Sequence, residues 1–173
     1  MGLEIDLLKK YPKTKRDVHG RASQKSGYDR KVARKFDYNF FDGNRRHGYG
    51  GYYYHPRFWT GVVSDMQEFY GLSKASKILD VGCGKGFLVY DLSVALDSNS
   101  VFGVDISEYA IENCKNEVVE NLSVACASDL PFGDNEFDLV ISINTLHNLA
   151  GDEIKQAFSE ISRVSKKDAF VTV

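Results

Sequence analysis

From residue 77 onward, short runs rich in Val and Ile alternate with segments whose apolar side chains recur every three or four positions. The short runs predict strands at 77–81, 101–105, 122–126, 137–143 and 169–173. The segments between them predict helices at 87–96, 107–120 and 152–164. Buried strands that each lead into a helix are typical of a parallel sheet with helices on both faces. We therefore expect an α/β fold with a doubly wound, mostly parallel sheet.

The chain ahead of this pattern is organised differently. Residues 1–26 are polar and lack a sustained periodicity, so we expect them to be mobile or loosely docked. Apolar side chains four positions apart, from Tyr28 to Phe36, predict a short helix, and a second helix is predicted from Pro56 to about residue 70. We therefore divide the chain into a basic N-terminal extension with a helical and loop structure, 1–56, and a core domain, 57–173.

The overall composition is that of a globular protein. Hydrophobic residues make up 43% and charged residues 27%, and no apolar run approaches the roughly 20 residues that a membrane-spanning helix needs. The first residues show no apolar signal-peptide segment, so we expect a cytoplasmic protein without membrane contact. Cys83, Cys114 and Cys126 form no C-x-x-C pair, which predicts free thiols and no disulfide, zinc or other metal site.

The net charge of −2 is unevenly distributed. Residues 1–46 hold 13 Lys and Arg against six Asp and Glu, a net charge of +7, whereas residues 47–173 carry −9. Such a basic segment either lies across the acidic remainder of the chain or meets an anionic partner. The first interpretation requires no function, and the sequence alone favours it.

The stretch LDVGCGKGF, residues 79–87, closes the first core strand and opens the first core helix. Gly82, Gly84 and Gly86 remove side chains where the backbone must turn sharply and a ligand must come close. The N-terminus of the following helix offers unpaired N–H groups. These features predict a nucleotide site at the carboxyl end of a parallel sheet.

An acidic residue at the end of the second strand supports this interpretation. Asp105 lies 19 residues beyond Gly86, where a carboxylate can accept hydrogen bonds from ribose hydroxyls. Alternatively, Asp105 only caps the helix that begins near Ser107. The glycines are spaced G-x-G-x-G and follow Asp80, unlike the G-x-G-x-x-G of dinucleotide sites.

With these motifs the sequence resembles the class I S-adenosylmethionine-dependent methyltransferases, which have a Rossmann-like fold. ILDVGCGKG is similar to the first motif of that family and GVDIS to the second, while ASDLPFGDNEFDLVISINTLHNL is similar to the third and fourth. The resemblance covers residues 57–173. It implies that the chain binds S-adenosylmethionine, releases S-adenosylhomocysteine and transfers a methyl group.

The resemblance also implies roles for residues of the first two motifs. Gly82 and Gly84, with Cys83 between them, would pass beside the methionine and adenosine portions of the cofactor. Asp80 would orient its amino end through the loop or a water, and Asp105 would hold the ribose.

Four later positions complete the implied cofactor site. Ile106 would lie on one face of the adenine, and Asp129, beside Ser128, would accept a hydrogen bond from the adenine amino group. The Leu130 backbone would meet a ring nitrogen, and Asn144 would line the methyl-transfer side. Asp129 could instead cap the DLPFGD turn.

The stretch RRHGYGGYYYHPRFW, residues 45–59, is expected to be a lid over the cofactor crevice and part of the acceptor pocket. Its glycines allow close backbone approach, its tyrosines offer flat faces and hydroxyls, and its arginines can bind a carboxylate. We predict that Gly50, Gly51 and Arg57 contact the amino-acid end of the cofactor. Alternatively, the stretch is a surface loop whose tyrosines pack against the helix at 58–70.

Methyl transfer from a sulfonium is an in-line displacement that requires alignment and exclusion of water rather than a catalytic triad, and none is recognisable. A general base helps only a poor nucleophile such as a hydroxyl; His147, His55 and the tyrosines are candidates, and the choice among them stays open. Asn144 and His147 could instead satisfy loop backbone groups. A small-molecule acceptor is favoured because no nucleic-acid module is recognisable, and a nucleic acid or protein acceptor stays open.

The chain departs from the family pattern at its C-terminus. The family core has seven strands, whereas the sequence predicts a sheet truncated after the fifth strand, so either later residues are missing or a partner, such as a second copy, covers the exposed edge. Two alternative functions follow: a non-catalytic or truncated cofactor-binding domain, and a nicotinamide-dependent oxidoreductase with a similar crevice.

Overall fold

The computed structural model describes residues 3–13 and 25–172 of the chain. Its helices are α2 (Gly27–Ala33), α3 (Tyr38–Phe41), α4 (Thr60–Tyr70), α5 (Phe87–Leu96), α6 (Glu108–Glu112) and α7 (Asp152–Val164). Short 3₁₀ helices are η1 (Pro56–Phe58), η2 (Asn116–Asn121) and η3 (Leu146–Asn148). The strands are β1 (Ile78–Val81), β2 (Val101–Asp105), β3 (Leu122–Val124), β4 (Phe137–Ile143) and β5 (Ser165–Thr172).

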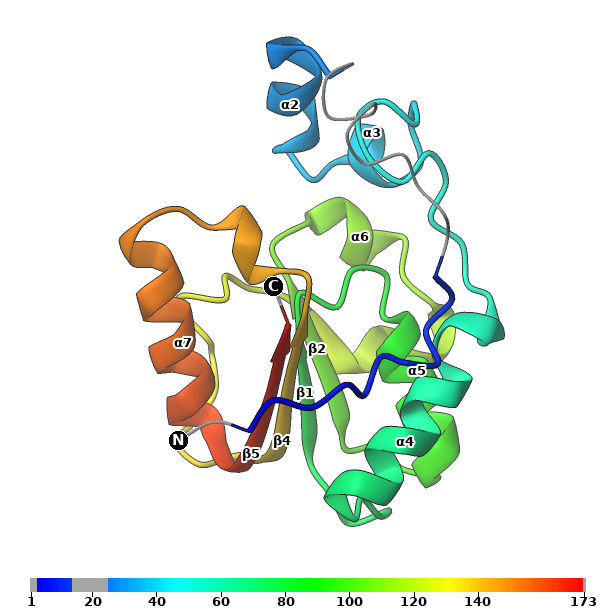
Figure 1. The fold of residues 1–173 in the computed structure, drawn as a ribbon, viewed down its shortest axis with the longest axis vertical. Coiled ribbons are helices and arrows are strands. Elements are labelled where there is room, and N and C mark those ends of the chain that lie inside the picture. The colour runs from blue at the N-terminus through cyan, green and yellow to red at the C-terminus, as the bar shows by residue number, and fades with distance from the viewer. Residues whose placement is uncertain (1–2, 14–24, 173) are drawn as a thin grey trace.

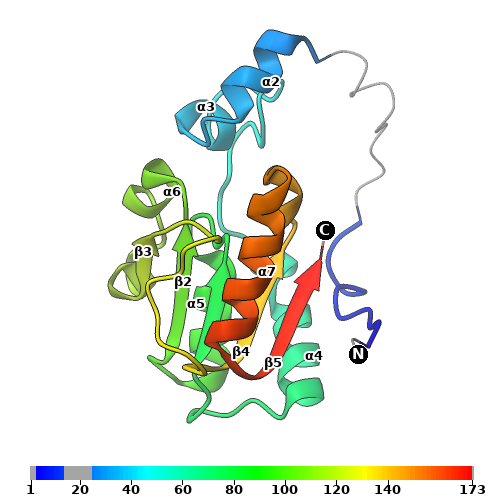
Figure 2. The same cartoon turned by 90° about the vertical axis from the view of Figure 1, so that its left-hand side faces the viewer.

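The five strands form one sheet in the order β3-β2-β1-β4-β5, and every neighbouring pair is parallel. The strand order reverses between β1 and β4, since the chain proceeds from β1 toward β3 and then returns to β4 on the other side. Such a reversal leaves a crevice outside the carboxyl ends of the strands. The predicted doubly wound α/β fold is confirmed, with Figures 1 and 2 showing helices on both faces.

Burial on both faces of the sheet explains the Val- and Ile-rich strands. All four residues of β1 are buried. Ile78 belongs to a core cluster with side chains of α4 and α5, whereas Leu79, on the opposite face, belongs to a cluster with Ala157 and Ile161 of α7. Alternate residues of one strand therefore anchor two helical layers, which holds the carboxyl ends of β1 and β4 in a fixed position.

One predicted helix was wrong. The segment 107–120 forms α6 and η2 with a break between them, because Lys115 donates its N–H to Lys85 O (3.0 Å) instead of to a carbonyl of the preceding turn. Two strand lengths also differ: β3 is shorter than predicted, and β5 begins at Ser165, directly after α7.

The expectation of a mobile or loosely docked N-terminus was wrong for residues 3–13. Leu7 is buried in the core beside α4, and Lys10 Nζ lies 2.6 Å from Asp65 Oδ1 on that helix. Tyr11 packs against Trp59, with ring centroids 4.9 Å apart. This part of the basic extension does lie across the core. The rest of 1–26, except residues 25 and 26, falls outside the described residues.

Residues 25–52, here called the cap, stand over the carboxyl end of the sheet (Figures 1 and 2). Ser26 and Asp29 form a capping box at the start of α2, and α3 is an element that the sequence pattern did not predict. The glycine-rich stretch folds back along α3: Tyr49 donates its N–H to Phe40 O (2.8 Å), and Gly51 donates to Phe41 O (3.0 Å). The cap is therefore a compact unit rather than an extended loop.

No helix of the described residues is long and apolar enough to cross a membrane.

Candidate functional site

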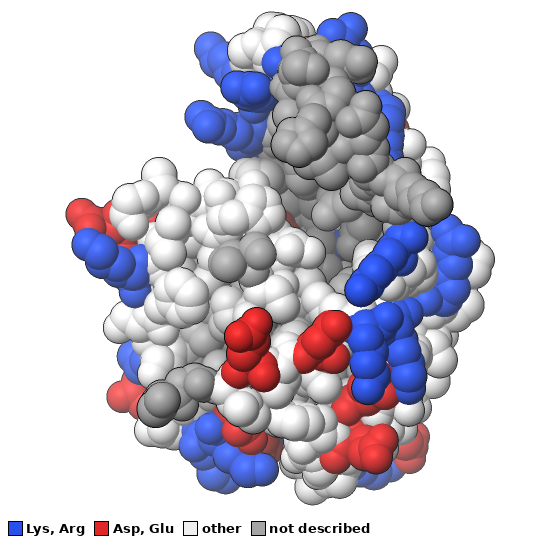
Figure 3. All heavy atoms as spheres, in the orientation of Figure 1, with Lys and Arg blue, Asp and Glu red and all other residues white. Residues whose placement is uncertain are grey.

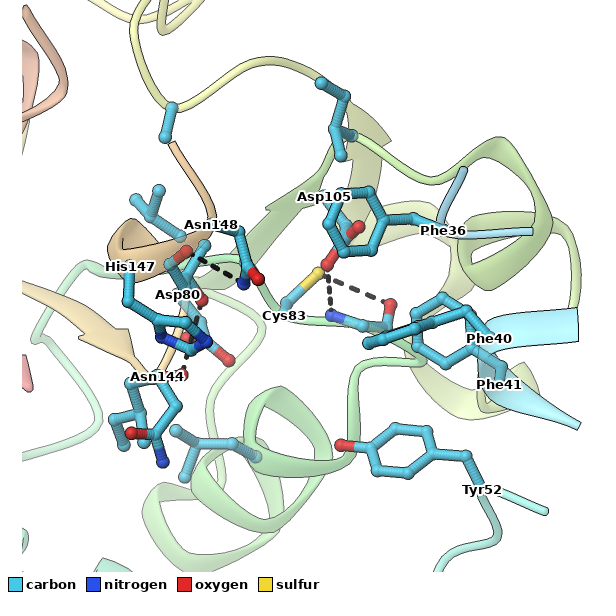
Figure 4. A pocket seen from close by; sticks show the side chains of 18 of the residues that line it. Phe36, Phe40, Phe41, Tyr52, Asp80, Cys83, Asp105, Asn144, His147 and Asn148 are labelled. Carbon is cyan, nitrogen blue, oxygen red and sulfur yellow. Dashed lines mark hydrogen bonds between the residues drawn. The ribbon is translucent and has the colours of Figure 1, made fainter. Parts of the chain in front are cut away.

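A cavity of about 470 Å³ lies at the carboxyl ends of β1, β2 and β4, beneath the cap (Figure 4). Its floor comes from the strand ends and the loops that follow them. Its roof comes from the cap, the N-terminal segment and Trp59. Pockets of 300–1,000 Å³ with a few convergent polar groups are typical of small-ligand sites. The position of the cavity at the strand-order reversal is where a doubly wound sheet places its ligand.

The glycine loop forms the cavity wall at the end of β1. Gly82, Gly84 and Gly86 all have positive φ values, +86°, +56° and +73°, and a Cβ at Gly82 would collide with Thr145. L-residues with side chains rarely adopt such backbone angles. The predicted need for glycine at these positions is confirmed.

The expected unpaired N–H groups at the N-terminus of α5 stay a prediction, whereas the amides of the glycine loop itself are hydrogen-bonded within the protein. Gly82 and Cys83 donate their N–H groups to Val104 O, at 2.7 and 3.0 Å. Gly84 donates to Asp105 Oδ2 at 2.8 Å. A ligand in the cavity would therefore meet the loop through its backbone and carbonyl groups, while its amides fix its shape.

Asp105, in the second motif, is hydrogen-bonded to the glycine loop of the first motif. Besides the bond from Gly84, its Oδ1 accepts the N–H of Ser107 at 2.9 Å. Burial raises the pKa of Asp105, and the hydrogen bonds from Ser107 and Gly84 oppose that rise. The side chain lines the cavity, and a carboxylate has about four acceptor sites, more than the backbone donors Ser107, Gly84 and Ile106 occupy. Ser107 itself caps α6 through Ala110, so Asp105 both shapes this turn and faces the cavity.

Asp80 is buried at the base of the cavity, with 4% of its surface exposed. Burial, with a smaller effect from Asp105, raises its pKa to about 7. Among the described residues none hydrogen-bonds the Asp80 side chain. A buried carboxyl without a partner that faces a cavity is suited to a cationic ligand group, because the charge of that group compensates for the lost hydration. The ammonium and sulfonium groups of S-adenosylmethionine fit this requirement.

The structure brings most of the predicted strand-end residues together. Seven of them line the cavity: Asp80, Gly82, Cys83, Gly84, Asp105, Ile106 and Asn144. Asn144 has φ +53°, a conformation that Asn tolerates better than most residues. His147 also lines the cavity, from η3.

Three predicted cofactor-binding residues lie outside the cavity lining, namely Ser128, Asp129 and Leu130. Ala125, Cys126 and Ala127 line it instead. The Leu130 N–H, predicted to face the adenine, donates to Glu160 Oε2 at 2.8 Å. Asp129 is exposed and donates its N–H to Cys126 O, as a turn residue does.

Gly50, Gly51 and Arg57 also lie outside the cavity lining. Arg57 is exposed, with its guanidinium 4.9 Å from the ring centroid of Phe58. His55 Nδ1 accepts the Arg57 N–H at 3.2 Å and caps η1, so this histidine is engaged away from the cavity. The contact of these glycines and Arg57 with the cofactor stays a prediction.

The aromatic stretch reaches the cavity through its tyrosines. Tyr49 and Tyr52 line it, and Tyr52 stacks on Phe87 at the start of α5, with centroids 4.9 Å apart. Tyr54 Oη donates to Asp91 Oδ1 at 2.5 Å on the same helix. Tyr52 and Tyr54 therefore pack against α5 rather than against the helix at 58–70, and Tyr49 packs against Phe40 and Phe41 of α3.

Several lining residues were missed from the sequence. They are Leu8, Tyr11, Phe36, Phe40, Phe41, Leu88, Thr145, Asn148 and Leu149. Phe40 and Phe41 belong to α3, which is too short to show a periodic pattern. Leu8 and Tyr11 reach the cavity only because the N-terminal segment docks on α4, a long-range contact without a local signal.

A buried ion pair joins the cap to the glycine loop. Lys85 Nζ lies 2.5 Å from Asp42 Oδ2, and the side chains are 7% and 12% exposed. Asp42 also accepts hydrogen bonds from Tyr109 Oη (2.6 Å) and from the N–H of Tyr52 (2.9 Å). These donors hold the pKa of Asp42 below its usual value against the opposing effect of burial. The cap is thus attached to the cofactor side of the cavity by a charged contact.

An all-parallel, doubly wound sheet with a glycine loop bonded to a carboxylate at the end of the next strand defines an α/β domain of the kind that binds ligands containing a nucleoside. A family model described as a methyltransferase domain matches residues 79–173, more than half of the chain. The chain therefore belongs to the methyltransferase domain family. The cofactor of this family is S-adenosylmethionine, which agrees with the resemblance of the motifs.

Individual relatives agree with this assignment. A demethylmenaquinone methyltransferase of Staphylococcus carnosus is 40% identical over 110 residues, covering 61% of this chain and 43% of the relative. A tRNA (carboxymethyluridine(34)-5-O)-methyltransferase of Arabidopsis thaliana is 35% identical over 117 residues, covering 66% of this chain and 27% of the relative. The chain thus spans less than half the length of either relative.

The fold also matches solved structures. The crystal structure of a SAM-dependent methyltransferase from Aquifex aeolicus superimposes with a TM-score of 0.50 at 24% identity, over 60% of this chain and 58% of that one. This likeness concerns the fold alone.

Proposed function

We propose that this chain binds S-adenosylmethionine in the cavity at the ends of β1 and β2 and transfers its methyl group to an acceptor that enters beneath the cap. The single observation that carries the proposal is the hydrogen bond from the Gly84 N–H to Asp105 Oδ2, because it joins the two parts of an adenosyl-binding crevice within one cavity. Family membership supports the same cofactor.

The proposed binding mode assigns different parts of the cofactor to different residues. Asp105 accepts hydrogen bonds from the ribose hydroxyls, and the exposed side chain of Ile106 covers the adenine. Asp80 compensates the positive charge at the methionine end. S-adenosylmethionine supplies the reactive methyl group when bound, and the protein contributes alignment and exclusion of water.

The cap and the N-terminal segment supply the shielding in this proposal. Phe41, Tyr49 and Tyr52 place aromatic rings over the glycine loop, as Figure 4 shows for Phe41 and Tyr52. His147 is the histidine that lines the cavity and would serve as the base for a hydroxyl acceptor. The division at residue 56 between extension and core, and a cytoplasmic location, stay predictions from the sequence.

The acceptor is the open part of the proposal. Relatives include a demethylmenaquinone methyltransferase and a tRNA methyltransferase, so the family accommodates small and large acceptors. The sequence favours a small molecule, and because the cavity of about 470 Å³ also holds the cofactor in this proposal, the acceptor group occupies only the space that the cofactor leaves. An acceptor group carried by a larger molecule could also enter such a space.

Parallel thermal-shift titrations with S-adenosylmethionine, S-adenosylhomocysteine and NAD test the cofactor. The first two ligands should raise the melting temperature in a concentration-dependent manner and NAD should not, because only a ligand that binds the native state stabilises it. Stabilisation by NAD alone would support an oxidoreductase instead. Cofactor binding without transfer of a radiolabelled methyl group to any acceptor of a broad panel would favour a non-catalytic domain.

A further inference from the structure

The outer face of the cap gathers basic side chains. On α2 and the turn that follows it, Arg30 and Arg34 are four positions apart, as are Lys31 and Lys35, and all four are exposed. Residues at this spacing share one face of a helix. Asp29 is buried. Figure 3 shows Lys and Arg gathered over this upper part of the molecule.

The acidic residues of the cap do not cancel this charge. The cap holds seven Lys and Arg against three Asp, a net charge of +4. Asp29 lies 3.3 Å from His47 Nε2 and 3.5 Å from Arg46, and Asp42 pairs with Lys85 of the glycine loop. Asp37 accepts the N–H of Asn39 and caps α3. The acidic groups thus serve the internal structure of the cap, while Arg30, Lys31, Arg34 and Lys35 are exposed.

The same cap carries exposed aromatic rings. Tyr28 is 72% exposed and Tyr38 is 54% exposed, and each is held by an edge-on contact, Tyr28 with His47 and Tyr38 with Tyr109. The large hydrophobic side chains exposed on the cap are all tyrosines: Tyr28, Tyr38 and Tyr49. Cations that track a phosphate backbone, together with rings on which bases stack, are the means by which proteins bind single-stranded nucleic acids.

The inner face of the same cap lines the cavity through Phe36, Phe40 and Phe41. A nucleic acid strand bound on the outer face would therefore be separated from the proposed methyl-transfer site only by the cap. We propose that the cap docks single-stranded nucleic acid and so delivers an acceptor nucleotide to the cavity. This inference rests on the proposed function and names the acceptor class for it.

Two observations favour this partner over an anionic membrane. Membrane-surface helices carry Leu, Phe or Trp on their apolar face, whereas the described cap exposes only tyrosines among its large hydrophobic residues. In addition, residues 47–173 carry a net charge of −9, which repels an extended anionic surface but leaves a strand free to bind the cap alone.

Fluorescence anisotropy with a labelled single-stranded RNA of about 15 nucleotides, and with DNA of the same sequence, tests the docking on the full chain. Binding of either strand should weaken as the salt concentration rises. The logarithm of the association constant, plotted against the logarithm of the salt concentration, should have a slope of about −2 or steeper, which corresponds to roughly three neutralised phosphates. Reversing the charge of Arg30, Lys31, Arg34 and Lys35 to Glu should weaken binding at least tenfold and flatten the slope. Tyr28→Ala with Tyr38→Ala should weaken binding several-fold at unchanged slope.

A matched control reverses four exposed lysines outside the cap: Lys74, Lys155, Lys166 and Lys167. This variant has the same net charge as the cap variant and should lose less than threefold in affinity. Thermal shift with S-adenosylmethionine should be the same in both variants, so a failure of docking is separable from a failure of cofactor binding. Equal losses in the two variants, unchanged affinity in the cap variant, or binding to phosphatidylglycerol vesicles without binding to either oligonucleotide would overturn the proposal.

Discussion

Lys85 of the glycine loop and Asp42 of the cap form a buried ion pair with 2.5 Å between Nζ and Oδ2. This contact connects two segments that are 43 residues apart and that line the same cavity. A buried ion pair is costly to break on one side only, because the remaining charge loses its partner without gaining water. The pair therefore makes the position of the cap depend on the glycine loop.

Lys85→Met should destabilise the protein by about 3 kcal/mol in urea unfolding, since it leaves the Asp42 carboxylate buried beside only Tyr109 and the Tyr52 N–H. Adding Asp42→Asn should recover part of this loss, because the second change removes the unpaired charge. Lys155→Met, which breaks an exposed pair with Asp152, is the control and should change nothing measurable. Purely additive effects of the Lys85 and Asp42 substitutions would contradict a coupled pair.

Asp80 should make cofactor binding depend on pH. Its pKa of about 7 means that lowering the pH from 7 to 5 protonates the carboxyl, whereas the ammonium of the cofactor, with a pKa near 8, stays charged. A bound cation favours the ionised carboxylate, so affinity should fall up to about tenfold per pH unit below 7 and level off above it. Calorimetry across this range measures the slope, and Asp80→Asn should be nearly flat.

The raised pKa of Asp80 has opposite effects on binding and on stability: a lower pH should weaken cofactor binding but stabilise the free protein. Because the folded state binds the Asp80 proton more tightly than the unfolded state, this group stabilises the free protein as the pH falls from about 7 toward the unfolded value near 4. Urea unfolding of the wild type and of Asp80→Asn at pH 6 and 8, without cofactor, isolates this contribution. A pH dependence that is identical in the two proteins would show that Asp80 is already ionised at pH 6.

Gly82→Ala should abolish detectable cofactor binding, because a Cβ at φ +86° is strained and collides with Thr145, so the loop must move. Gly27→Ala is the matched control: its Cβ meets nothing within 4 Å at the start of α2, and it should leave binding unchanged. Thermal-shift titration of both variants with S-adenosylmethionine compares them directly. Normal binding by the Gly82 variant would mean that the cofactor does not rely on this loop.

Arg163 should hold the loop that follows β3. Its guanidinium donates to Phe132 O (2.7 Å), Leu130 O (3.0 Å) and Glu160, while Glu160 accepts the Leu130 N–H. Arg163→Ala should cost about 2 kcal/mol in unfolding free energy and increase hydrogen exchange of residues 128–134, because these carbonyls lose charge-assisted hydrogen bonds. Arg163→Lys should recover only part of the lost stability, because an ammonium group cannot donate several hydrogen bonds in one plane as a guanidinium does. Unchanged exchange in Arg163→Ala would exclude this positioning role.

The core and the glycine loop were predictable from the sequence because local rules determine them. The period of the apolar residues predicted β1, β2, α5 and α7. The glycine motif and Asp105 at the end of the next strand anticipated that Gly82, Gly84 and Asp105 line one cavity. The cap was not predictable in this way. Phe40, Phe41 and Lys85 acquire their roles through contacts across many residues, and the amides of Gly82 and Gly84 find partners on β2 that no motif reveals.

The distribution of charge shows the same limit. Residues 1–46 carry a net charge of +7, and the sequence does not show that different parts of this segment have different roles. In the fold, Lys10 pairs with Asp65 of the core, whereas Arg30 and Arg34 are exposed on the cap. The sequence favoured one interpretation for the whole segment, whereas the structure supports core docking for residues 3–13 and a separate surface for α2.

Isothermal titration of S-adenosylmethionine into the wild type and Asp105→Ala tests the central claim most directly. The wild type should bind one molecule, and the variant should bind at least about tenfold more weakly, a loss of roughly 1.4 kcal/mol, because the ribose loses its carboxylate acceptor. Asp97→Ala, a change of the same kind at an exposed carboxylate beyond α5, should bind like the wild type. Equal affinity in the wild type and Asp105→Ala would contradict the account, and so would a wild type that binds no S-adenosylmethionine.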